Sequence, residues 1–129
     1  MKDIEERRMR YMEYRFSDAP SVSECFPSVD SIVVDYTITY ESAFGCVIDK
    51  GCSTYNRESK VVFLYNCRNN DCTGLGFDLF PEIHSSISEN KETYSGELKC
   101  QGKEAPDHSN ACPTKMEYSI RVVYRKGSR

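Results

Sequence analysis

The chain has 129 residues, of which 39% are hydrophobic, and it contains seven cysteines and no tryptophan. This length fits one compact domain, and the apolar share is sufficient for a hydrophobic core, which excludes a fully disordered chain. No stretch approaches the roughly 20 apolar residues that a membrane-spanning helix requires. The formal net charge of −3 argues against general polyanion binding, although it leaves room for a local basic face.

The N-terminal part of the chain fits two patterns. Within residues 1–16 the apolar side chains allow a short amphipathic helix, but Met12, Tyr14 and Phe16 alternate with charged residues as in a strand. We expect a short helix or frayed arm that leads into a brief strand. Two prolines mark residues 17–31 as a connecting segment.

Two strands separated by a long loop are expected next. Residues 31–41 alternate apolar and polar side chains, which predicts a strand with one buried face. Residues 42–59 have no periodic pattern, which predicts a loop of about eighteen residues, long for a compact domain. Residues 60–67 are apolar almost throughout, as is typical of a strand that is covered on both faces.

A helix and two further strands follow. Asp78 is a candidate N-cap, Pro81 is tolerated in a first turn, and apolar residues then repeat at helical spacing, which predicts a helix over about 78–90. Residues 92–101 and 114–126 carry apolar side chains on one face and polar ones on the other, which predicts the last two strands.

These elements predict an α+β fold with one packed helix on a four- to five-stranded mixed sheet. A strand–helix–strand unit of this length is most simply a crossover, which leaves strands 60–67 and 92–101 parallel. The last strand then returns antiparallel through a hairpin. We expect a single domain over residues 1–129, with an arm and connector at 1–30 and a core at 31–126.

Four cysteines are expected to converge at one end of this sheet. Cys67 ends a predicted strand and Cys72 follows a turn rich in Asn and Asp, whereas Cys100 ends the next strand and Cys112 precedes the last one. Four thiolates around one tetrahedral ion form a closed site with no position for a substrate. We therefore predict a structural zinc site that contributes to folding. The alternative is a set of scattered buried thiols or disulfides.

Other residues offer alternative ligands. Cys46 and Cys52, in the long loop, would form a ribbon-like site with the first cysteine pair if that loop folded back along the next strand. Otherwise they are free thiols or a local disulfide. His108 could replace one ligand, and an exposed loop histidine is its alternative. Cys25 has no evident partner, so a buried thiol is expected there.

The first twenty residues are rich in charge and lack the apolar region of a secretory signal, and no lipidation motif is visible. We therefore expect a cytoplasmic protein without membrane attachment. In that compartment thiols stay reduced, which favours a metal site over disulfides. The odd number of cysteines agrees, because seven cannot all pair within one chain.

The motifs of common small enzymes do not occur in the sequence. There is no phosphate-binding loop, no HExxH and no GxSxG, and Glu82-Ile83-His84 runs in the wrong order for a nucleobase deaminase. We therefore predict a non-enzymatic protein, with a small thiol-dependent enzyme as an alternative.

The favoured function is a binding module, of regulator or inhibitor type, that contacts another protein or a second copy of itself. Its candidate contact residues are apolar side chains of the long loop: Phe44, Val47, Ile48 and Tyr55. The alternative is that these side chains cap the core.

A nucleic-acid-binding zinc module is the rival hypothesis. Residues 114–129 carry five basic residues against one acidic residue, and the candidate contacts among them are Arg121, Arg125 and Lys126. The alternative is an ordinary solvated strand face.

Overall fold

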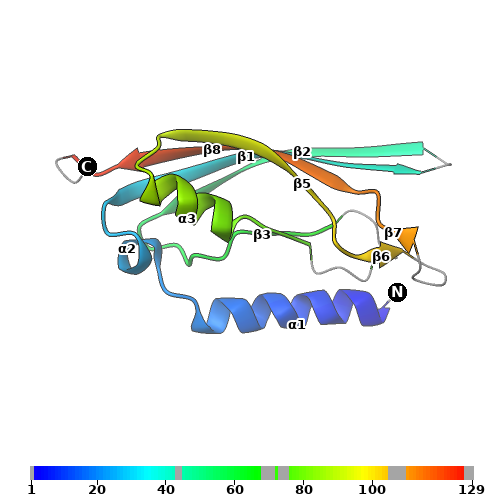
Figure 1. Ribbon diagram of the computed structural model, residues 1–129. Helices are drawn as coiled ribbons and strands as arrows, with labels where there is room; N and C mark the ends of the chain where they lie inside the picture. The colour runs from blue at the N-terminus through cyan, green and yellow to red at the C-terminus, as the bar shows by residue number, and fades with distance from the viewer. Residues whose placement is uncertain (1, 43–44, 68–71, 73–75, 105–109, 127–129) are drawn as a thin grey trace.

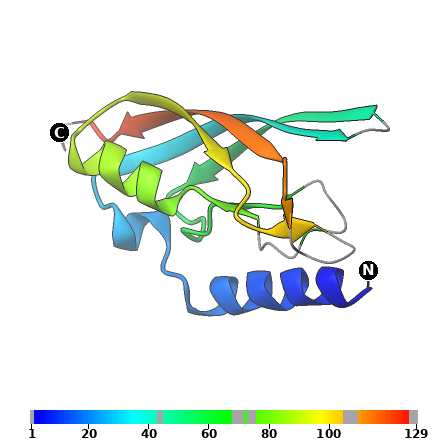
Figure 2. The ribbon, with the colours of Figure 1, turned by 45° about the vertical axis from the view of Figure 1, so that its right-hand side comes forward.

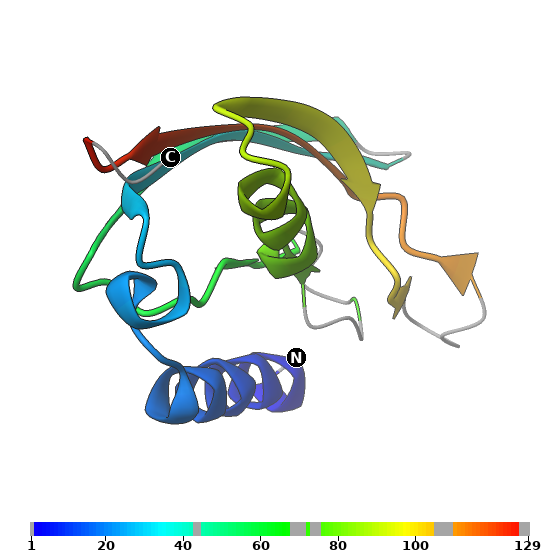
Figure 3. The same ribbon diagram turned by 60° about the vertical axis from the view of Figure 1, so that its left-hand side comes forward.

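The computed structural model of the chain describes residues 2–42, 45–67, 72, 76–104 and 110–126. Its elements in chain order are α1 (Lys2–Asp18), α2 (Val22–Cys25), β1 (Val29–Ser42), β2 (Gly45–Asn56), β3 (Leu64–Tyr65), β4 (Phe77–Asp78), α3 (Phe80–Ser88), β5 (Thr93–Lys99), β6 (Lys103–Glu104), β7 (Asn110–Ala111) and β8 (Lys115–Tyr124). The three helices lie on one side of a four-stranded sheet (Figures 1 and 3). The predicted α+β class is therefore confirmed.

The large sheet has the strand order β2-β1-β8-β5, and every neighbouring pair is antiparallel. The sheet is thus antiparallel rather than mixed, because the segment 60–67 does not join it as a parallel strand. The predicted hairpin of the last two strands is confirmed, since β5 and β8 pair from Thr93↔Arg121 to Lys99↔Lys115. Two small sheets, β3–β4 and β6–β7, lie outside the large one.

The core lies between the large sheet and the helices. Alternate residues of β1 and β8 face it, and pairs such as Ile32 with Val122 bring buried side chains together across the ladder. α3 covers this face with the fully buried Ile83, which confirms the helix predicted over about 78–90. Burial of each such side chain contributes roughly 1.5–3 kcal/mol.

The region expected as a loop over 42–59 is mostly strand β2, which forms a hairpin with β1. β8 pairs with β1 only as far as Thr39, so the hairpin extends beyond the rest of the sheet (Figures 1 and 2). We call this extension, residues 40–42 and 45–47, the β1–β2 arm. The first four residues of β2 are exposed, so no buried face imposes an apolar alternation on them.

The apolar side chains of segment 60–67 are mostly buried, but the segment lies outside the large sheet. Val61 donates its backbone N–H to the carbonyl of Pro20, and Leu79 donates to the carbonyl of Phe63, each at 3.0 Å. The two residues of β3 pair with β4. A continuous apolar run indicates burial, but it does not distinguish a buried strand from a buried irregular segment.

α1 is a helix over Lys2–Asp18, so the strand expected within residues 1–16 is wrong. The alternation of apolar residues in that region does not mark a buried face, because Tyr14 and Phe16 are 65% and 44% exposed. Half of the residues in the segment are Lys, Arg or Glu, whose long side chains favour a helix. Specific polar contacts connect this helix to the rest of the molecule.

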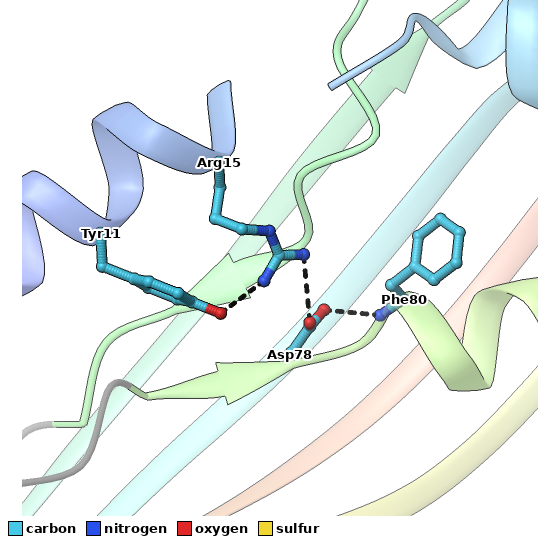
Figure 4. A network of polar contacts seen from close by, with 4 residues as sticks. All are labelled: Tyr11, Arg15, Asp78 and Phe80. Carbon is cyan, nitrogen blue, oxygen red and sulfur yellow. Dashed lines mark hydrogen bonds and ion pairs between the residues drawn. The ribbon is translucent and has the colours of Figure 1, made fainter. Parts of the chain in front are cut away.

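One of these contacts is made by Arg15. Its guanidinium donates to the Tyr11 hydroxyl at 2.6 Å and to the carboxylate of Asp78 at 3.2 Å (Figure 4). The same carboxylate accepts the backbone N–H of Phe80 at 2.9 Å. Asp78 was predicted as the N-cap; Leu79 occupies that position, and the Asp78 side chain caps the helix from one residue earlier.

Candidate metal centre

Cys67, Cys72, Cys100 and Cys112 converge in the structure, which confirms the predicted cluster. Their Sγ atoms all lie within 4.8 Å of one another, and the separations are 3.5 Å for Cys67–Cys112 and 3.4 Å for Cys72–Cys100. All four side chains are buried and none is in a disulfide. This arrangement is compatible with a structural metal site.

Three segments bring the cysteines to one end of the molecule. Cys67 follows β3, Cys100 directly follows β5, and Cys112 lies between β7 and β8. This is the end at which the N-terminus of α1 lies (Figures 1 and 2). The convergence does not need the predicted crossover, because it requires only that segment 60–67 and β5 end on the same side.

Backbone hydrogen bonds hold two of the cysteines across the loop between β5 and β8. The N–H of Cys100 donates to the carbonyl of Thr114 at 2.9 Å, and the N–H of Cys112 donates to the carbonyl of Gly102 at 3.0 Å. The β5–β8 pairing therefore continues into the cluster, and the small β6–β7 sheet extends it. These hydrogen bonds fix the backbone from which both sulfur atoms extend.

Two polar groups contact the sulfur atoms. The N–H of Gly102 donates to the Sγ of Cys100 at 3.4 Å, and the Sγ of Cys112 lies 3.3 Å from the Oγ1 of the buried Thr114. Hydrogen bonds of this kind orient metal ligands and stabilise negative charge on sulfur.

Arg8 of α1 reaches the cluster from the other side. Its guanidinium donates to the carbonyl oxygens of Cys67 at 3.3 Å and of Cys72 at 3.1 Å. Sequence reasoning missed this residue, because 59 positions separate it from Cys67 and no local pattern links them. It missed Thr114 as well, although the spacing of two residues from Cys112 was an available signal.

The pKa of the Cys100 thiol is raised above its ordinary value by its hydrogen bond with Cys67 and, second, by burial. A buried thiol of this kind stays protonated unless a nearby cation stabilises the thiolate. Joint ionisation of the four thiols therefore requires positive charge at the centre of the cluster, which a divalent metal ion supplies.

The donor set fits a single tetrahedral ion. Zn–S bonds of about 2.3 Å give a tetrahedron whose sulfur–sulfur edge is about 3.8 Å. Two sulfur–sulfur separations in the cluster, 3.4 and 3.5 Å, are slightly shorter than that edge, and none exceeds 4.8 Å. Changes of at most about 1 Å in the sulfur–sulfur separations would bring all four sulfur atoms to the tetrahedral edge.

No protein-family model, curated protein or solved structure matches the chain. Within the described part of the chain, no helix is both long and apolar enough to cross a membrane. The functional interpretation therefore depends on the residues of the chain itself.

The other candidate ligands do not join the cluster among the described residues. Cys46 and Cys52 are exposed on β2, six residues apart along one strand, or roughly 20 Å. That distance excludes both the ribbon-like site and a local disulfide in this conformation. His108 lies outside the described residues. Cys25, expected as a buried thiol, is only partly buried and packs against the core.

The candidate partner-binding residues divide into two groups. Val47 and Ile48 are 49% and 60% exposed on β2, at and just beyond the β1–β2 arm. Tyr55 instead packs its ring edge-on against Phe63 at 4.7 Å, and its hydroxyl lies 2.8 Å from that of Tyr65. Phe44 lies outside the described residues.

The candidate nucleic-acid contacts Arg121, Arg125 and Lys126 are exposed. Arg121 stands on the sheet face opposite the helices, between Val33 and Thr93 in the register. The same face of β8 carries the acidic Glu117, so basic and acidic side chains are interspersed on it. This mixture differs from the continuous positive surface that phosphate binding favours.

Proposed function

We propose that this chain is a small non-enzymatic protein-binding module whose fold is held by one structural zinc ion on Cys67, Cys72, Cys100 and Cys112. The observation that carries the metal part is the burial of four sulfur atoms within 4.8 Å of one another. An all-sulfur tetrahedral site suits zinc or iron, and zinc is the usual choice for a closed, redox-inactive site.

The proposed ion would connect the end of segment 60–67, which lies outside the large sheet, to the paired ends of β5 and β8. It would link the end of segment 60–67, the end of β5 and the start of β8, so that the chain between them is divided into closed loops. In small zinc domains the metal contributes roughly 10 kcal/mol or more of apparent binding free energy to folding.

Three features support a binding role over thiol chemistry. The four-thiolate site is closed, so it offers no open position to a substrate. Cys25 lines an apolar cavity of about 330 Å³ beside α1, but burial raises the pKa of its thiol. A hydrogen bond with Asp35 raises the pKa of Cys52. Raised pKa values keep both thiols protonated at neutral pH and therefore poorly nucleophilic.

The protein-binding part of the proposal rests on the β1–β2 arm. It extends beyond β8 and, with Ile48 next to it, presents exposed apolar side chains on a strand whose outer edge pairs with no other described strand. Exposed apolar side chains on a free strand edge are a common basis for strand addition by a protein partner.

The deciding experiment is metal analysis of native protein combined with alkylation of its thiols. We expect about one zinc per chain, with the four cluster cysteines protected and Cys25, Cys46 and Cys52 modified. The double variant Cys46→Ser/Cys52→Ser is the matched control and should keep its zinc, whereas Cys100→Ser should lose most of it. Metal-free native protein with an unchanged melting temperature in chelator would refute the zinc proposal.

A further inference from the structure

β2 is an edge strand with a distinctive arrangement of thiols. It pairs with β1 on one side, and no described strand pairs with its other side. Its partners in β1 place Cys46 opposite Glu41 and Cys52 opposite Asp35, so both thiols lie on the sheet face opposite the helices. Both are exposed and free, and Asp49 lies midway between them in the sequence.

We infer that the outer edge of β2 pairs with the same edge of a second copy of the chain, antiparallel about a two-fold axis at Asp49, so that Cys46 of each copy lies opposite Cys52 of the other. The inference specifies the partner in the protein-binding role proposed above. It rests on that part of the proposal and does not depend on the metal.

The symmetry of the cysteine positions selects a second copy over an unrelated partner. In a two-fold antiparallel pair, residues equidistant from the axis stand opposite each other and point to the same face of the joined sheet. A register centred on Cys46 or on Cys52 would place one cysteine opposite its own copy, whereas the register centred on Asp49 forms two cysteine pairs. The opposed Cα atoms would be about 4.5–5.5 Å apart, within the range that a disulfide spans.

The neighbouring residues fit the same register. Val47, which is 49% exposed, would stand opposite Gly51 of the second copy. In this chain the ring of Tyr36 lies over Gly51, so that Val47 would meet an aromatic surface. Ile48 would stand opposite the aliphatic stem of Lys50 on the other face. The two most exposed apolar side chains of β2 would therefore be covered together.

The shape of the molecule leaves room for this pairing. The hairpin of β1 and β2 extends past the remaining strands (Figures 1 and 2). With the axis at Asp49, the two hairpins would overlap side by side, and β1, β8 and β5 of each copy would lie on the outer side of its own β2. One contact in this register is unfavourable. The Asp49 carboxylates of the two copies stand opposite each other, and like charges in that position are destabilising.

Oxidation of two complementary variants tests the register. Cys46→Ser and Cys52→Ser are mixed in equal amounts at about pH 8, near the ordinary thiol pKa, and treated with diamide. Each disulfide removes two protons and two electrons from two thiols, and these reduce the diazene of diamide to a hydrazine. The register predicts a disulfide-linked heterodimer in the mixture, because Cys52 of one variant then faces Cys46 of the other.

Each variant alone supplies the control, since it sets cysteine opposite serine in this register. The wild type should form disulfide-linked dimers, whereas each single variant should remain monomeric on non-reducing gels. Both variants keep the four cluster cysteines, so cross-linking through those would appear in the single-variant samples. Cross-linking of either variant alone, or none in the mixture, would overturn the register.

Sedimentation under reducing conditions tests the pairing without any covalent bond. Val47→Lys should weaken self-association about tenfold or more, and Asp49→Asn should strengthen it about threefold or more by removing the like-charge contact. Val123→Lys, an equally exposed valine on β8, is the matched control and should have no effect. Zinc-loaded protein that stays monomeric at ~1 mM would overturn the dimer and leave the metal proposal standing.

Discussion

The guanidinium of Arg8 donates a hydrogen bond to the carbonyl oxygen of Cys72 at 3.1 Å, across 64 positions of the sequence. A second hydrogen bond from the same side chain reaches the carbonyl of Cys67. Four thiolates on a divalent ion would carry a net charge of about −2, which a nearby guanidinium partly offsets. The N-terminal helix is therefore connected to the segment that would hold the metal.

Replacement of Arg8 should weaken metal binding. Arg8→Gln removes the positive charge and both carbonyl contacts, and the loss of an outer contact of this kind typically costs 10- to 100-fold in metal affinity. Competition with a coloured chelator measures the change. Arg10→Gln, which removes an exposed arginine from the same helix, should leave the affinity unchanged. Equal affinities of the two variants would show that Arg8 has no role at the metal.

Loss of one ligand should destabilise the whole fold. Cys100→Ser leaves three thiolates, and we expect the free energy of unfolding to fall by about 4 kcal/mol or more, as for other losses of a structural metal. Denaturant titration with and without chelator measures this. Chelator should reduce the wild-type stability toward that of the variant, whereas the exposed-site variant Cys52→Ser should change stability by about 0.5 kcal/mol at most. A wild type insensitive to chelator would contradict this expectation.

The elements that the sequence predicts well have one buried face. β1, β5 and β8 alternate because one side of each lies on the core, and α3 places buried residues such as Ile83 at helical spacing. The cysteine cluster was also predictable, because Cys67, Cys100 and Cys112 lie at or next to the ends of predicted strands and Cys72 follows one of them after a short turn. Its convergence needs only that these ends meet, so it does not depend on whether segment 60–67 joins the large sheet.

The elements that the sequence predicts poorly depend on contacts between residues that are distant in the chain. β2 forms through its backbone ladder with β1, and its exposed first residues carry no alternation that would reveal it. α1 is attached through hydrogen bonds of Arg8 and Arg15. The sequence around an arginine in a charged segment does not indicate which distant group accepts its hydrogen bond. The segment 60–67 shows the reverse case, because its apolar run correctly indicates burial without indicating a strand.

Removal of the Asp78 carboxylate should affect two helices together. Asp78→Ala removes the ion pair with Arg15 of α1, at 3.2 Å, and the acceptor for the Phe80 N–H at the start of α3 (Figure 4). The capping contact accounts for most of an expected loss of roughly 1–2 kcal/mol, because partly exposed ion pairs contribute little. Arg15→Gln should therefore cost less than Asp78→Ala in denaturant titrations. Equal losses would place the stabilisation in the ion pair instead.

Stability should fall at alkaline pH through the buried tyrosines. Burial, followed by the nearby charge of Glu82, raises the pKa of Tyr118 to about 12, whereas an unfolded tyrosine titrates near about 10. The unfolded chain then loses its proton first, so the contribution of Tyr118 is fully present below about pH 10 and disappears as the pH rises toward about 12. Tyr118→Phe should flatten this decline without abolishing it, because burial also raises the pKa values of Tyr55 and Tyr65. Denaturant titrations across this pH range measure the slope, and Tyr14→Phe, on the exposed side of α1, should reproduce the wild-type curve.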